Sequence, residues 1–382
     1  MIQKYYFNVS CDQIKSNNEP SIRFMVNLVL EIIKHMKIKA LKFGISLLML
    51  LAILISCEED DNSTSTVPVR DRTEQQVADR DSLLAYLSTH YYNSGFFEPS
   101  SDYEYTDIII TELPQDDDGN YLDMPDPDNN TLLIDAVETL TTTFLDTEYE
   151  YYVLRLNQGE GVAPKFTDAV RFRFEGSIVE TKEVFQSIST PSNLNLQADG
   201  FGSSGSIKAW QLVMPTFNTA TGFTLNNGIV DYDNYGLGVM FVPSGLAYFS
   251  AIILDVPVYS NLIFKFELLQ HEEVDHDNDG IPSYVEDYNN DEDVLDNDTD
   301  EDDIPDFVDF DDDGDGITTF NELVQATYNQ EPVLAENEYI YSRDETSEGI
   351  VIITVTAQDT NSNGILDYLD DSVSINYNED EE

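Results

Sequence analysis

The chain has 382 residues, of which 74 are acidic and only 18 are lysine or arginine, so its formal net charge is −56. Such a charge excludes electrostatic binding to nucleic acid or to an anionic membrane surface, and it makes metal cations the natural counter-ions. The length suggests two or three domains, and the hydrophobic content of 41% is enough for a buried core. Cys11 and Cys57 lie at or before the export signal described next, so no disulfide framework is expected.

An export signal is predicted near the start of the chain. The basic segment Met36–Lys42 precedes the apolar run Phe43–Ile55, which is too short to span a bilayer comfortably. Residues 1–35 do not fit ahead of a signal peptide, so we expect translation to start at Met36. The run Leu54–Cys57 resembles a bacterial lipobox, in which the cysteine is lipidated and becomes the N-terminus. An ordinary signal-anchor helix is the alternative.

The segment after Cys57 bears on location. Glu58–Asp61 is acidic and looks like the surface-export signal of Bacteroidetes lipoproteins, whereas a solvated tether is the plainer interpretation. The resemblance implies an outer-membrane lipoprotein of the cell envelope, exposed at the surface and held in the membrane by lipid on Cys57.

An amphipathic helix is predicted at Thr73–Tyr92, with Thr73 and Gln76 as a capping box, and we expect it to pack on the next domain or on a partner chain. Thr106–Leu113 predicts a strand, and residues 132–145 read as either helix or strand. We assign no chemistry to residues 95–148.

The central stretch predicts a sheet with one short helix. Val170, Phe172 and Phe174 alternate with charged residues, which is typical of a half-buried strand. The segments 238–242 and 262–269 read as further strands. The only tryptophan, Trp210, lies in a predicted helix of about two turns, 207–214, which Pro215 ends.

The same stretch carries an ordered series of short motifs. They are Leu154–Gly161, Asp168-x-Val170, Phe174-Glu-Gly176, Phe185, Ile207–Trp210, Val242–Tyr248, Val256-Pro257 and Leu262–Leu269. Their order resembles FKBP-type peptidyl-prolyl cis-trans isomerases over about 120 residues. The family fold, an antiparallel sheet wrapped around one short helix, agrees with the pattern of strands and helix predicted independently.

The resemblance implies a prolyl pocket that binds proline-containing polypeptides without a cofactor. The implied roles are a pocket face for Phe174, a wall for Phe185, a backbone N–H donor at Ile207, a floor for Trp210, a hydroxyl donor for Tyr248 and a rim for Val256 and Phe264. A dry pocket that favours the twisted amide lowers the rotation barrier of roughly 18–20 kcal/mol without a nucleophile or base. This suits a chain whose histidines after Cys57 form no convincing nucleophile–base pair.

Three departures from the family pattern bear on activity. Gln186 follows the wall residue where the family commonly has Asp, Ala209 replaces the usual Gly, and the segment 190–206 is longer than usual. Gln186 carries no charge, so a second hypothesis is a binding module that catalyses weakly. Core packing alone is the alternative role for these aromatic residues, and we favour it for Phe172 and Phe266.

An acidic repeat begins after His271. It forms loop 1 (275–286), loop 2 (298–309), loop 3 (311–322) and loop 4 (359–370). Positions one, three, five and twelve are Asp275, Asp277, Asp279 and Glu286; Asp298, Asp300, Asp302 and Asp309; Asp311, Asp313, Asp315 and Glu322; and Asp359, Asn361, Asn363 and Asp370. This spacing matches an EF-hand calcium loop, with glycine at position six in all but loop 2. The Ile-Pro after the turn in loops 1 and 2 resembles thrombospondin type 3 repeats.

Two alternatives for the tail stay open: a solvated, disordered acidic run, and a calcium-stabilised structural or adhesive surface protein. We expect calcium to fold the tail, and 350–356 predicts a strand within it. The predicted fold class is α+β: an FKBP-like antiparallel sheet around a short helix, followed by a calcium-loop tail with little secondary structure. The predicted divisions are an upstream region and signal (1–56), a tether (57–72), an N-terminal extension (73–148), an FKBP-type domain (149–271) and the tail (272–382).

Overall fold

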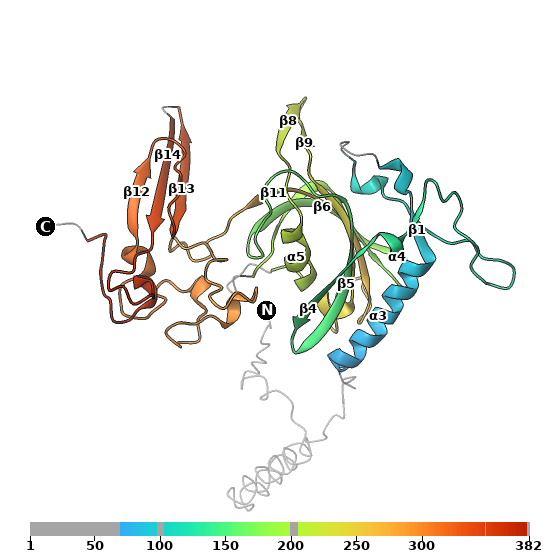
Figure 1. The fold of residues 1–382 in the computed structure, drawn as a ribbon, viewed down its shortest axis with the longest axis horizontal. Helices are drawn as coiled ribbons and strands as arrows, with labels where there is room; N and C mark the ends of the chain where they lie inside the picture. Colours follow the sequence, from blue (N-terminus) through green and yellow to red (C-terminus); the bar gives the residue numbers. More distant parts are fainter. Residues whose placement is uncertain (1–68, 98–102, 199–204, 348, 380–382) are drawn as a thin grey trace, which may run out of the picture. The chain divides into compact units, whose positions relative to one another are not determined.

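A computed structural model describes residues 69–97, 103–198, 205–347 and 349–379 (Figure 1). All of them belong to the compact unit Val69–Glu382. The predicted signal, the lipobox with Cys57 and most of the tether lie outside the described residues. Within these ranges no helix is both long enough and apolar enough to cross a membrane.

A six-stranded antiparallel sheet forms the main body (Figure 1). Its order is β4-β5-β10-β11-β6-β7, built from β4 (Glu138–Phe144), β5 (Thr147–Asn157), β6 (Ala169–Ile178), β7 (Val184–Asn195), β10 (Gly236–Val242) and β11 (Leu262–Glu272). The alternation of apolar and charged residues in the sequence matches the burial of β6, in which the even-numbered residues are buried. Strand β4 comes from the predicted extension and pairs with β5 along its whole length.

One face of the sheet packs on the short helix α5 (Lys208–Val213), around which the sheet curves (Figure 1). Trp210 is 5% exposed there, and Phe266 and Val213 are fully buried. Each such side chain contributes roughly 1.5–3 kcal/mol through its burial. The α-helix ends at Val213, earlier than predicted, and a 3-10 turn, η4 (Met214–Thr216), carries the chain through Pro215.

The opposite face packs on α3 (Arg72–Thr89), so the predicted amphipathic helix packs on the sheet. Leu83 and Leu87 are fully buried against alternate residues of β5 and β10. The predicted capping box was wrong: Asp71 caps the helix by accepting from the Glu74 N–H at 3.0 Å. Such a cap contributes about 1 kcal/mol.

The remaining N-terminal elements form a small separate sheet of order β2-β1-β3. Its strands are β1 (His90–Tyr92), β2 (Ile110–Glu112) and β3 (Thr131–Leu132). The 3-10 turns η2 (Ser94–Phe96) and η3 (Tyr105–Asp107) and the one-turn helix α4 (Leu133–Ala136) lie between or after these strands in the chain. The predicted strand 106–113 is shorter than expected because η3 takes its first residues. A hairpin, β8 (Gly222–Asn226) and β9 (Ile229–Asp233), follows α5.

The acidic tail contains a three-stranded antiparallel sheet of order β12-β14-β13. The strands are β12 (Val324–Tyr328), β13 (Glu338–Thr346) and β14 (Gly349–Thr356). The tail also contains four 3-10 turns in its described residues: η6 (Val294–Asp296), η7 (Asp306–Val308), η8 (Thr319–Glu322) and η9 (Asp367–Leu369). The strand predicted at 350–356 is β14, and Val355 is buried with Ile281 of loop 1 and Tyr368 of loop 4. With this sheet in the tail, the described chain is richer in sheet than the α+β prediction implied.

Candidate functional site

An aromatic cavity of about 220 Å³ opens where β6, β7 and β11 meet α5. Of the eight predicted pocket residues, six line it: Phe174, Gln186, Ile207, Trp210, Tyr248 and Phe264. These residues come from five separate elements or loops of the chain, so the fold brings them together.

Close aromatic packing forms the floor of this cavity. The ring centroids of Trp210 and Phe264 are 4.9 Å apart, and those of Trp210 and Phe174 are 5.8 Å apart in an edge-to-face arrangement. Phe172 stacks on Phe174 at 5.0 Å with an interplanar angle of 3°. Such pairs hold each other in fixed orientations, so the floor is preorganised before a ligand arrives.

Two hydrogen-bond donors border the aromatic floor. Burial raises the pKa of the Tyr248 hydroxyl, which therefore stays protonated. Within the described ranges, neither this hydroxyl nor the Ile207 N–H at the start of α5 has an acceptor. A bound peptide carbonyl could accept from either donor, because no acceptor in the described part of the chain competes for them.

Helix α3 fixes the loop that carries Tyr248. Asp79, 2% exposed, accepts from the Ser244 N–H at 2.9 Å and from its hydroxyl at 2.6 Å. Arg72 donates to the Gly245 carbonyl at 3.1 Å. The N-terminal extension therefore contributes to the geometry of the cavity, a role that no local sequence pattern indicates.

The other two predicted residues lie beside the cavity. Phe185 packs edge-to-face against Phe264 at 5.8 Å, behind the lining, and Val256 is 6% exposed within the core. The lining also includes residues that were not predicted: Phe172, Ile188, Ser192, Asn193, Leu194, Gly205 and Ser206. Phe172 could have been found, because it lies two residues before Phe174 on the same face of β6. It is also 3% exposed, so it serves the core and the pocket together.

A larger cavity of about 320 Å³ lies near the ends of β6 and β11, and its described lining contains no Phe, Tyr or Trp. Asp168, the residue just before β6, is 1% exposed and accepts from the Lys165 N–H at 2.8 Å. Burial raises the pKa of Asp168 to about 7. This carboxyl is therefore a pH-sensitive element of the core outside the aromatic cavity.

We expect Asp168→Asn to flatten the pH dependence of the body's stability. The folded pKa of Asp168 lies above the ordinary value, so the folded state holds more protons between about pH 4 and 7. The contribution of Asp168 to the free energy of unfolding therefore falls as pH rises through this window, by at most about 1.4 kcal/mol per pH unit. Urea unfolding, followed by Trp210 fluorescence at several pH values, measures the free energy of unfolding of each variant. The exposed Asp255→Asn is the control, and an unchanged pH slope in Asp168→Asn would contradict this expectation.

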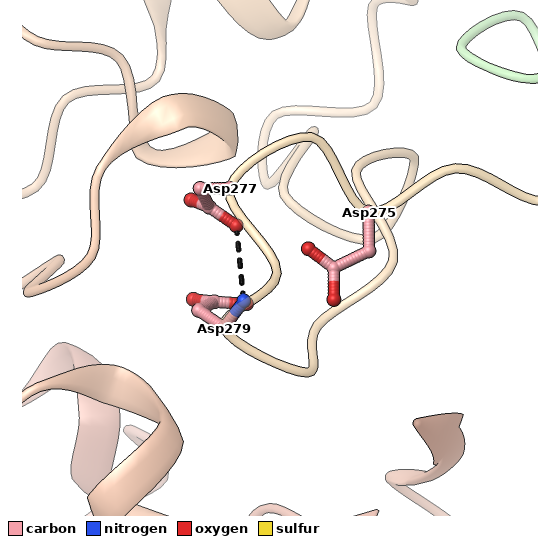
Figure 2. A group of neighbouring side chains, drawn as sticks. All are labelled: Asp275, Asp277 and Asp279. Carbon is pink, nitrogen blue, oxygen red and sulfur yellow. Dashed lines mark hydrogen bonds between the residues drawn. The ribbon is translucent and has the colours of Figure 1, made fainter. Parts of the chain in front are cut away.

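Loop 1 shows how the acidic repeats turn. Figure 2 shows the carboxylates of Asp275, Asp277 and Asp279 facing one another across the loop, and their ligand oxygens lie within 4.8 Å of each other. Position six has positive φ in every loop, from +75° at Asp303 of loop 2 to +103° at Gly280 of loop 1. Glycine adopts this conformation without strain, which explains its presence at position six in the other three loops.

All four loops share one internal clasp. The N–H at position two donates to the side chain at position nine: His276 to Ser283, Thr299 to Asp306, Asp312 to Thr319 and Thr360 to Asp367, at 2.8–3.2 Å. The clasp fixes each loop from within, and in loops 1, 2 and 3 the carboxylates at positions one, three and five converge.

Several carboxylates in these loops are buried without partners. Glu286 is 0% exposed and Glu322 is 1% exposed, and neither oxygen of either group accepts a hydrogen bond from a described residue. Burial, with Asp313 nearby, raises the pKa of Glu322 to about 9. Burial with Asp279 nearby raises that of Asp277 to about 10. Orphaned buried carboxylates are costly, and a hard cation with oxygen ligands would satisfy them.

The loops are not equivalent. In loop 3, one carboxylate oxygen each of Asp311, Asp313 and Asp315 lies within 4.8 Å of the others. The same holds for Asp298, Asp300 and Asp302 in loop 2. Asp309, at position twelve of loop 2, instead accepts from the Asp311 N–H at 3.0 Å. In loop 4, Asp370 accepts from the amides of Asn361 and Asn363 at 2.8 and 2.7 Å. Loop 4 is therefore already satisfied within the protein.

Residues 287–298 form a fifth turn of the same geometry. The Asp291 N–H donates to Asp287 and Asn289, and the Glu292 N–H donates to Asp287 at 2.9 Å, as at the matching positions of loops 2 and 4. Glu292 has φ +63° at position six. The spacing Asp287-x-Asn289-x-Asp291 could have predicted this turn, but Glu292 replaces the glycine expected at position six, so the turn was not predicted.

Comparisons with known proteins give partial matches. Residues 276–349 match the family model described as BamM C-terminal. No curated protein matches the chain significantly. Similar solved structures include a peptidyl-prolyl cis-trans isomerase from Pseudomonas syringae pv. tomato, with 14% identity, a TM-score of 0.29 and coverage of 53% of this chain and 98% of that one.

Two further solved structures are similar to this chain. FkpA from Escherichia coli has 21% identity and a TM-score of 0.26, with coverage of 35% of this chain and 51% of that one. The N-terminal domain of FKBP42 from Arabidopsis thaliana has 12% identity and a TM-score of 0.27, with coverage of 36% and 95%. Because these TM-scores are below 0.5, the functional proposal rests on the residues of this chain.

Proposed function

We propose that this chain is an FKBP-type peptidyl-prolyl cis-trans isomerase that acts on X-Pro bonds of exported proteins. The observation that carries the proposal is the preorganised cavity, in which Trp210 and Phe264 pack at 4.9 Å beside the Tyr248 hydroxyl, which has no acceptor among the described residues. The test is whether the full-length chain accelerates cis-trans exchange in a proline peptide. An absence of acceleration by folded protein would contradict it.

The geometry supports catalysis by binding the twisted amide. Rotation about X-Pro breaks the amide resonance, and the carbonyl turns out of the plane at a barrier of roughly 18–20 kcal/mol. The aromatic floor holds the proline ring in an environment with little water. The Tyr248 hydroxyl and the Ile207 N–H are then available to the peptide carbonyls. Interactions that are stronger for the twisted form than for either planar form lower the barrier.

Tyr248→Phe should slow catalysis while preserving the fold. The substitution removes only the hydroxyl, and a lost hydrogen bond to the transition state corresponds to roughly a tenfold fall in kcat/KM. The measurement is exchange in a proline peptide, monitored by NMR. Tyr259→Phe, on the same loop but outside the cavity lining, is the control. Equal rates for wild type and Tyr248→Phe would exclude Tyr248 as a donor in catalysis.

A second candidate is an FKBP-like binding module that catalyses little. Gln186 favours it, because this residue lines the cavity and is exposed, and it carries no charge where the family commonly has Asp. A proline peptide that quenches Trp210 fluorescence without being turned over would support this alternative. Gln186→Asp should then raise the exchange rate, whereas in a competent isomerase it would change little.

For the tail we propose Ca²⁺ binding with a structural role. Loops 1 and 3 support it most strongly, since each combines three converging aspartates with a buried, unpartnered glutamate at position twelve, Glu286 or Glu322. These residues would hold the ion with hard oxygen ligands, and the ion would balance their charge. Removal of calcium from the full-length chain tests this role.

The proposed location is the outer membrane, with a lipid on Cys57 as the anchor. The export signal and lipobox of the sequence support it, and the match to the BamM C-terminal family fits an outer-membrane-related protein. Metabolic labelling with a fatty acid tests the anchor: wild type should be labelled and Cys57→Ser should not. Labelling of both would contradict it.

A further inference from the structure

Three buried carboxylates from two different loops meet at one point in the tail. Asp279 and Glu286 belong to loop 1, and Asp312 belongs to loop 3. One oxygen of each lies within 4.8 Å of the others. Asp279 and Asp312 are each 1% exposed and Glu286 is 0% exposed. Position two of a calcium loop is not expected to supply a ligand, so the sequence did not indicate Asp312.

The side chain of Asp312 is oriented toward this point from within loop 3. Its Oδ1 accepts from the Thr319 hydroxyl at 3.0 Å, whereas its Oδ2 has no hydrogen-bond partner in the described part of the chain. Asp279 Oδ2 and both oxygens of Glu286 also lack partners. Position two is His276, Thr299 and Thr360 in loops 1, 2 and 4, so loop 3 alone has a carboxylate there.

No lysine or arginine of the tail neutralises this cluster. Arg343 is the only lysine or arginine after Glu267, and it pairs with Glu331 at 2.6 Å in an exposed position. Burying an ion costs several kcal/mol unless an opposite charge compensates it. Because the donors are all carboxylate oxygens, the compensating group expected is a hard divalent cation.

We propose that Asp279, Glu286 and Asp312 form one buried calcium site shared by loops 1 and 3. The inference rests on the calcium binding proposed for the tail and adds to it a ligand from outside loop 1. An ion held there ties the two loops together through Asp312, so loop 1 does not bind as an independent EF-hand-like unit. Its occupation couples the folding of the two loops.

Calcium titration of the full-length chain tests the shared site. In Asp312→Asn, which keeps the size of the side chain and its bond to Thr319, we expect the affinity of one site to fall by about tenfold or more. The exposed Asp344→Asn, on β13, is the matched control and should bind as wild type does. Circular dichroism with saturating calcium checks that each variant is folded.

A second variant, Glu286→Gln, tests the same site through a different ligand, so the conclusion does not depend on one substitution alone. If both residues hold the same ion, Asp312→Asn, Glu286→Gln and the double variant should all lose the same single site. Loss of two sites in the double variant, or wild-type binding by Asp312→Asn, would overturn the shared site while leaving calcium binding intact. Wild type that binds no calcium would overturn the calcium proposal itself, and the shared site with it.

Discussion

Removing calcium from the full-length chain with a chelator should expand the acidic tail and leave the six-stranded sheet intact. Glu286 and Glu322 are buried, and within the described residues neither oxygen of either has a hydrogen-bond partner, so without a cation they must be protonated or move into water. The measurements are hydrodynamic radius for the tail and fluorescence of Trp210 for the body. Because Trp210 is the only tryptophan, its signal reports the body alone.

A salt control separates binding from screening. If calcium only screens repulsion, about 1 M NaCl should compact the tail equally well, because it reduces the Debye length to about 3 Å. Specific ligation predicts that NaCl compacts the tail less than calcium does, even when calcium is far more dilute. A hydrodynamic radius that does not change with excess chelator would contradict the coupling of calcium binding to folding.

Trp210→Leu should abolish most isomerase activity and also lower stability. Trp210 contacts the rings of Phe172, Phe174, Phe264 and Phe266, so its loss removes the floor of the cavity. Large-to-small substitutions at such core positions cost roughly 3–5 kcal/mol of unfolding free energy. We expect kcat/KM in a proline-peptide exchange assay to fall by roughly a hundredfold, through lost complementarity to the twisted amide.

Phe217→Leu separates the two effects of that substitution. Phe217 is fully buried and packs on Phe266 at 5.0 Å, but it does not line the cavity. This variant should lose stability and keep most of the activity under conditions where it is folded. Equal losses of activity in the two variants would mean that Trp210 acts only through the core.

The sequence predicted the parts of the fold that depend on local patterns. Alternation in 170–174 identified β6 and its buried face, and the single tryptophan identified the helix that packs there. The spacing of aspartates located loops 1 to 4, because the turn needs a carboxylate at fixed offsets and a residue with positive φ.

Features that depend on tertiary contacts could not be predicted. The bonds from Asp79 to Ser244 join residues far apart in the chain, so no local pattern records them. Val256 matches the rim position of the family motif, but core packing places it beside the cavity. Asp312 occupies an ordinary position in its own loop, and only the fold brings it to Glu286.

The central claim is that the aromatic cavity catalyses X-Pro rotation. Its most direct test is the exchange rate of a proline peptide, measured by NMR with the full-length chain in saturating calcium. We predict acceleration by wild type that falls in Tyr248→Phe and is nearly lost in Trp210→Leu. The uncatalysed rate with wild type, while Trp210 fluorescence shows a folded body, would contradict the claim.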